Sequence, residues 1–129
     1  MKKDVPLCPS SSCEEGNLLL GIVGREGRVE LLPEPMEIDQ AFVQIAHQGR
    51  EPRQRFRFTS PCAQGACVQW REGRCGVGDQ MIKLVTPEEL DRPLPACVIR
   101  PQCRWYLQSG PNICHICPEV IDTRTLPAP

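Results

Sequence analysis

The sequence CVIRPQCRWYLQSGPNICHIC, residues 97–117, places four cysteines in a segment whose prolines and turn-forming residues indicate irregular backbone. A thiolate binds soft and borderline metals tightly, and it loses its proton in doing so. Four thiols on such backbone therefore indicate metal ligands rather than core side chains. We take this segment as the feature around which the chain is organised, and we predict a metal site there.

The composition of the whole chain supports this prediction. Nine cysteines in 129 residues are an odd number, so they cannot all pair in disulfides. The apolar run at residues 18–23 is too short for a signal core or a membrane span, and we expect a soluble cytoplasmic protein with reduced thiols. A secreted disulfide scaffold is the less favoured alternative. The 15 Lys and Arg nearly balance the 16 Asp and Glu, which argues against nucleic-acid or membrane partners.

The spacing of the cysteines favours iron–sulfur clusters over zinc. Zinc sites usually take two close C-x2–4-C pairs, whereas iron–sulfur clusters draw four thiolates from more varied spacings, often with proline after the last ligand. This chain has two C-x4-C pairs and ends its cysteine region with Cys117-Pro118. Eight thiols would complete two [4Fe–4S] sites and leave one spare; one cluster, a [2Fe–2S] cluster or zinc are the alternatives. The candidate ligands are Cys8, Cys13, Cys62, Cys67, Cys75, Cys97, Cys103, Cys114 and Cys117.

The segment QCRWYLQSGPNICHICP, residues 102–118, resembles the C-terminal motif of FhuF-type ferric-siderophore reductases. That motif has two adjacent cysteines, a tyrosine and a later C-x2-C pair, and it binds a [2Fe–2S] cluster. Gln102 replaces the first cysteine here, and Cys97 is the nearest candidate for the fourth ligand. The resemblance implies iron–sulfur ligation but not an activity. The matching positions are Cys103, Tyr106, Cys114 and Cys117.

The sequence patterns in the first half of the chain predict a β-hairpin and a helix. Two apolar runs at residues 17–24 and 28–32 flank a glycine-containing turn and predict a β-hairpin, with Pro33 and Pro35 ending its second strand. Helical spacing predicts a helix over residues 39–48. Later in the chain, Thr86-Pro87-Glu88-Glu89 is typical of a capping box that opens a short helix.

Arg53, Arg55 and Arg57 alternate with Gln54, Phe56 and Phe58, which is the period of a β-strand. The pattern predicts phenylalanines facing inward and arginines facing outward. An exposed arginine face is ordinarily a solvated strand surface. The sharper hypothesis is a docking surface for an acidic redox partner.

The two histidines are weaker candidates for metal ligands than the cysteines. His47 stands at the end of the predicted helix, where an imidazolium would meet the negative end of the helix dipole, and we favour that role over metal binding. His115 lies between two cysteines and could replace a thiolate, but a residue this close to two ligands more often points away.

These observations predict a single α+β domain over residues 1–122, followed by an unanchored tail at 123–129. It would join an N-terminal hairpin, helix and strand, residues 1–58, to a loop-rich cysteine region that binds metal, residues 59–122. The leading hypothesis for function is a small iron–sulfur protein that transfers electrons or serves as a redox subunit. A cluster-based redox sensor and a zinc-stabilised interaction module are the alternatives, and a stand-alone enzyme is the weakest interpretation.

Overall fold

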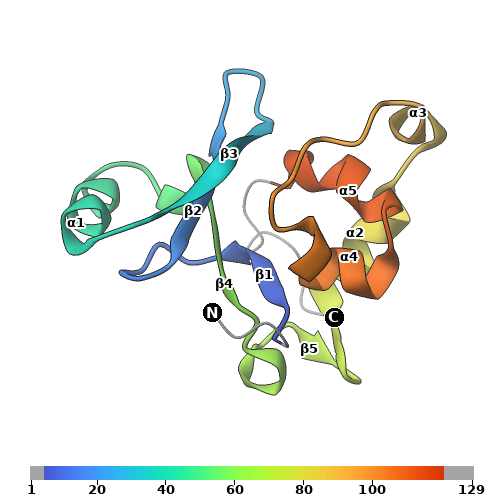
Figure 1. Cartoon of the computed structure of the whole chain (residues 1–129), viewed down its shortest axis with the longest axis horizontal. Coiled ribbons are helices and arrows are strands. Elements are labelled where there is room, and N and C mark those ends of the chain that lie inside the picture. The colour runs from blue at the N-terminus through green and yellow to red at the C-terminus, as the bar shows by residue number, and fades with distance from the viewer. Residues whose placement is uncertain (1–4, 121–129) are drawn as a thin grey trace.

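The computed structural model describes residues 5–120, and its centre is a four-stranded antiparallel sheet in the order β1-β4-β2-β3. Helix α1 lies on one side of the sheet, and the short helices of the cysteine-rich half lie on the other (Figure 1). The prediction of an α+β fold is confirmed. The strands are β1 (Leu7–Ser11), β2 (Leu18–Val23), β3 (Val29–Glu37) and β4 (Phe56–Pro61).

The predicted hairpin is present as β2 and β3, whose register pairs Val23 with Val29. The prediction that Pro33 and Pro35 end its second strand is wrong, because β3 continues to Glu37. β3 is an edge strand, and proline, which has no N–H group to donate, is tolerated at the edge of a sheet. The register shifts between Leu19 and Gly21, so the extra residues of β3 are accommodated in a bulge.

Helix α1 (Gln40–Gln48) confirms the predicted helix. The Asp39 side chain accepts a hydrogen bond of 2.8 Å from the Phe42 amide, and Gly49 follows the last turn. His47 lies in the last turn, as predicted, and its Nε2 is 3.2 Å from the Cys13 carbonyl oxygen.

The cysteine-rich half is built from short helices and turns rather than from loops alone. The capping box at Thr86 is confirmed, with reciprocal hydrogen bonds to Glu89 at the start of α3. The elements are β5 (Trp70–Arg71), β6 (Arg74–Cys75), α2 (Gly76–Met81), α3 (Pro87–Leu90), α4 (Arg104–Ser109) and α5 (Asn112–Ile116), with 3₁₀ turns at Pro52–Gln54, Gln64–Ala66, Ile82–Leu84, Arg100–Gln102 and Cys117–Glu119.

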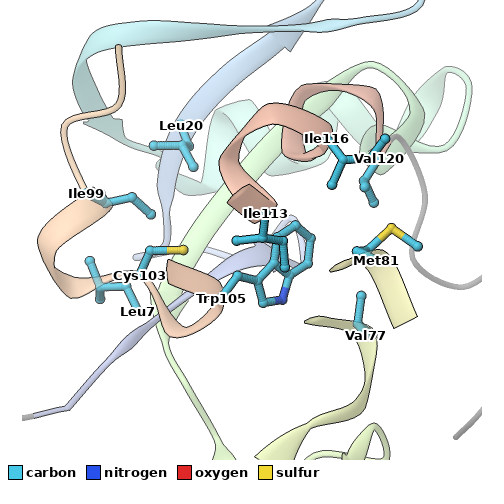
Figure 2. Packing of buried hydrophobic residues seen from close by; sticks show 10 residues of the cluster. All are labelled: Leu7, Leu20, Val77, Met81, Ile99, Cys103, Trp105, Ile113, Ile116 and Val120. Atoms are coloured by element: carbon cyan, nitrogen blue, oxygen red, sulfur yellow. The ribbon is translucent and has the colours of Figure 1, made fainter. Parts of the chain in front are cut away.

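The central strands bury both of their faces, which creates two hydrophobic clusters. Leu19 and Phe58 pack beneath α1 with Ile38 and Ala46. Leu20, which points the other way, packs with the helices of the cysteine-rich half around Trp105 (Figure 2). Residues from both halves of the chain thus share one cluster.

Strand β1 ties the two halves together along the backbone. It pairs with β4 through Cys8 and Ser60, and Leu7 also forms a parallel bridge to Cys103. No helix among residues 5–120 is long and apolar enough to cross a membrane. The tail expected at 123–129 lies outside the described residues.

We expect the Gly21→Ala variant to lose about 1–3 kcal/mol of unfolding free energy, the usual cost of overpacking. A Cβ at Gly21 would lie 2.7 Å from Val29 Cγ1 and 2.9 Å from the Glu30 carbonyl oxygen. Gly24→Ala is the matched control in the same hairpin, because its Cβ meets only the movable end of the Glu30 side chain, at 3.2 Å. Urea unfolding midpoints measure both variants. Equal midpoints for the two would contradict the packing described for Gly21.

Candidate metal centre

The four cysteines of residues 97–117 line one small apolar cavity of about 20 Å³. We call it the enclosed site. Cys103 occupies the N-cap position of α4, and Cys114 lies within α5. The C-x2-C spacing places Cys117 just after the last turn of α5, close to Cys114 on the same side of the chain. The enclosed site consists of Cys97, Cys103, Cys114 and Cys117.

Burial controls the charge of these thiols. It raises the pKa of Cys103 to about 12, with further contributions from Cys117 and Cys97. Burial is also the main cause that raises the pKa of Cys97 and of Cys114. Burial therefore favours the protonated form of Cys97, Cys103 and Cys114. A bound metal ion reverses this balance, because it stabilises the thiolate directly.

Arg57 reaches the enclosed site from the central strand β4. Its Nη1 donates a hydrogen bond of 3.0 Å to Cys117 Sγ, and its Nη2 donates one of 2.8 Å to the Cys117 carbonyl oxygen and another to that of Val120. The side chain is only 3% exposed, so this guanidinium is buried against a sulfur atom. A buried cation requires a compensating negative charge, which thiolate ligands would supply.

Arg100 adds a second guanidinium to the enclosed site. It lines the cavity, and its hydrogen bond to Cys114 opposes the effect of burial on the pKa of that thiol. Its Nε is buried and has no hydrogen-bond partner within residues 5–120. An anionic occupant of the cavity would suit both arginines.

A second cavity, of about 390 Å³, is lined by Cys8 together with the three cysteines of residues 62–75. We call it the open site, because Cys67 at its rim is exposed. Burial raises the pKa of Cys8, and the neighbouring Cys62 and Cys75 contribute to the increase. The open site consists of Cys8, Cys62, Cys67 and Cys75.

Backbone amides already point toward two sulfur atoms of the open site. The Gln64 amide lies 3.4 Å from Cys62 Sγ, and the Gln69 amide lies 3.4 Å from Cys67 Sγ. Hydrogen bonds from backbone amides to ligand sulfurs tune the potential of a bound cluster. Arg104 also lines the cavity, with its guanidinium 4.9 Å from the centre of the Trp70 ring.

The prediction of three aligned, exposed arginines is wrong. The strand begins only at Phe56, and Arg57 is buried beside Cys117. Arg55 donates hydrogen bonds to carbonyl oxygens at the end of α1, and Arg53 lies beside the open site with an Nη2 bond of 2.9 Å to the Ser10 carbonyl oxygen. The alternating pattern misled because β4 is a central strand and buries both of its faces.

Cys13 stands apart from both sites. It packs in the cluster beneath α1 and is 5% exposed, and burial raises its pKa. The two histidines line neither cavity, although His115 is next to Cys114 in sequence. Cys13 therefore lines neither of the two cavities.

The two sets of four cysteines surround their cavities without converging on one point. No group of three or more His, Cys, Asp or Glu side chains within residues 5–120 is placed to hold a single metal ion. What the chain brings together is a pair of thiol-lined cavities, each with adjacent arginines. Comparison of the chain with protein-family models, with characterised proteins and with solved structures gives no match.

We expect the metal-free protein to become less stable as the pH rises from about 9 to about 12. The folded state keeps the Cys103 proton up to a pKa of about 12, whereas the unfolded chain loses it near the usual pKa of 9.0. The folded state thus binds more protons in this interval, so its stability falls as pH rises. Thermal unfolding in the presence of a chelator measures the effect.

Cys103→Ala should flatten this alkaline slope, because the variant has no thiol to ionise at that position. Cys67→Ala is the control, since Cys67 is exposed. An unchanged slope in the Cys103 variant would show that other groups cause the loss of stability.

Proposed function

We propose that this chain is an iron–sulfur protein that binds two clusters and transfers electrons, as a carrier or as the redox subunit of a larger system. One observation carries the proposal: eight of the nine cysteines line two cavities in two sets of four, and the ninth packs elsewhere. Four thiolates are the ligand set of a [4Fe–4S] cluster. The order of the cysteines along the sequence does not predict which belong together.

The arginines around both sites support clusters as the occupants. A cluster held by four thiolates carries negative charge, which Arg57 and Arg100 would offset at the enclosed site. Donors aimed at sulfur, such as Arg57 Nη1, raise the potential of a cluster. The proposal also agrees with the iron–sulfur ligation that the resemblance to the FhuF-type motif implies, because Cys97 lines the same cavity as the three matching cysteines.

The first test is the metal content and the absorption spectrum of protein purified without oxygen. We expect a brown protein with about eight iron and eight sulfide ions per chain, because each four-thiolate cluster of this type holds four irons. A colourless protein with stoichiometric zinc would overturn the proposal and leave a zinc-stabilised module in its place.

Paired substitutions test the division into two sites. Cys62→Ala with Cys67→Ala should remove about half of the iron, and Cys97→Ala with Cys114→Ala should remove the other half. Cys13→Ala is the control and should keep all of it, because Cys13 lies outside both cavities. A loss of iron in the Cys13 variant, in protein that remains folded by circular dichroism, would contradict the assignment of ligands.

Arg57→Met tests the role of the buried guanidinium. The variant removes a positive charge and a hydrogen bond from Cys117 Sγ, so we expect the reduction potential of one cluster to fall. A shift of about 60 mV corresponds to a tenfold change in a one-electron equilibrium. Arg25→Met, in the exposed turn between β2 and β3, is the charge-matched control and should leave both potentials unchanged. Redox titration followed by absorbance near the visible maximum measures the shift.

A further inference from the structure

We propose that the open site of the metal-free chain is a pocket for a small hydroxylated aromatic acid, whose carboxylate binds to Arg104. The inference goes beyond the proposed function and does not depend on it, because it requires no metal and no set of converging ligands. A cluster held by the same cysteines would occupy the same cavity, so the acid and the cluster exclude each other.

The open cavity has the size and the apolar wall of a small-molecule site. Its volume of about 390 Å³ lies in the range of ligand pockets, which is roughly 300–1,000 Å³. Trp70, Trp105 and Val77 are among its lining residues. Trp105 is 2% exposed and packs in the hydrophobic core shown in Figure 2, so it closes the cavity toward the interior. An aromatic ring suits such a wall better than a hydrated ion does.

The charges around the open cavity favour an anion. Arg53 and Arg104 line the cavity, and Glu14 contributes one carboxylate. The Glu14 carboxylate already accepts a hydrogen bond from the Ser12 hydroxyl. Burial raises the pKa of Cys8, which favours the neutral form of that thiol. Together these groups give the wall a net positive charge.

Arg104 is the side chain placed to bind the carboxylate. Its guanidinium lies 4.9 Å from the centre of the Trp70 ring, and stacking on an aromatic ring orients the planar group. Within residues 5–120 it forms no ion pair, and its Nε is buried without a hydrogen-bond partner. Buried polar atoms are nearly always paired, and a carboxylate matches the planar fork of a guanidinium. A carboxylate in the cavity would therefore supply the partner that Arg104 lacks.

Gln69 adds a requirement for a hydrogen-bond donor on the ligand. Its side chain lines the cavity, and its Oε1 is buried without a partner in the described part of the chain. Its backbone is held in place, because its amide lies 3.4 Å from Cys67 Sγ and its carbonyl oxygen accepts a hydrogen bond of 2.7 Å from the Gly76 amide. A hydroxyl group on the ring of the acid would donate to this oxygen.

Isothermal titration calorimetry of the full chain with a chelator tests the pocket, with para-hydroxybenzoate as the probe. We expect a single saturable site. The neutral analogue para-hydroxybenzamide should bind on the order of tenfold more weakly, the usual effect of losing a hydrogen bond to a charged group. Equal affinity for the two compounds, or no binding of the acid, would overturn the proposal. Benzoate should also bind more weakly than the probe, and equal affinity for these two acids would overturn the role of Gln69.

Arg104→Met removes the guanidinium and keeps an apolar side chain over Trp70. We expect this variant to bind para-hydroxybenzoate about as weakly as the unmodified chain binds the benzamide, because both changes remove the same charged contact. Arg25→Met, in the exposed turn between β2 and β3, is the charge-matched control and should bind the probe as the unmodified chain does. Unchanged affinity in the Arg104 variant would contradict the assignment.

Tryptophan fluorescence gives a second readout at the site itself. The chain has two tryptophans, and both line the open cavity. We expect the emission to change with the same dissociation constant that calorimetry gives. Constant emission at saturating probe would place the binding elsewhere and would overturn the pocket.

The outcomes are distinguishable from those of the proposed function, which depends on iron content. Circular dichroism first measures whether the metal-free chain is folded. If it is unfolded, saturating probe should restore the helical signal, because a ligand that binds only the folded state stabilises it. Failure to restore the signal would overturn this inference and leave cluster binding standing. A chain that binds the probe but holds no iron would overturn the proposed function and leave the pocket.

Discussion

The parallel bridge between Leu7 and Cys103 is the contact on which the rest of this structure depends. Through it, strand β1 belongs both to the sheet and to the cysteine-rich half. The Cys62 amide extends the connection with a hydrogen bond of 2.8 Å to the Pro6 carbonyl oxygen. Without β1, the open site would lack Cys8, and the sheet would lose the edge strand that is bridged to Cys103. A short N-terminal strand thus joins two regions that are far apart in sequence.

The two faces of the central sheet carry different kinds of side chains. The face toward α1 carries phenylalanines in tilted and edge contacts, with ring centroids 5.4–6.2 Å apart. The opposite face carries Arg57 and the fully buried Thr59, whose hydroxyl donates a hydrogen bond of 2.7 Å to the Cys8 carbonyl oxygen. Both Arg57 and Thr59 thus bond to cysteines of the two sites, to Cys117 and to Cys8. The sheet therefore packs against α1 through an aromatic core on one side and against the sulfur-lined cavities on the other.

Much of the fold could be predicted from local signals. The hairpin, helix α1 and the capping box at Thr86 depend on turn residues and caps that act over a few positions. Strand β1 could not be predicted in this way, because Cys8 and Pro9 carry no alternating apolar pattern and the strand exists only through its partners. The burial of Arg57 could not be predicted for a similar reason: the strand period places it correctly opposite the phenylalanines, but burial of both faces of β4 depends on the tertiary structure.

The candidate ligands were all visible in the sequence, whereas their division into two sites was not. The C-x4-C repeat groups Cys8 with Cys13, yet the structure separates them onto opposite faces of the sheet. Strand β1 ends at Ser11 and Cys13 lies beyond it in a bend, so Cys13 packs beneath α1 rather than beside Cys8. Spacing alone therefore indicates that two cysteines can be ligands without indicating that they share a metal.

The two sites differ in how much of the chain each one needs. The enclosed site draws its four cysteines from residues 97–117, while the open site joins Cys8 to residues 62–75 across the sheet. Closing the longer loop costs more chain entropy, so the open site forms only when β1 is paired with β4. Under the proposed function, a ligand that binds only the folded state stabilises it, and a cluster at the open site therefore stabilises the pairing of β1. The sheet and the open site thus depend on each other, whereas the sheet gives the enclosed site Arg57, which bonds to Cys117, and part of its wall through Pro9, Leu20 and Leu31.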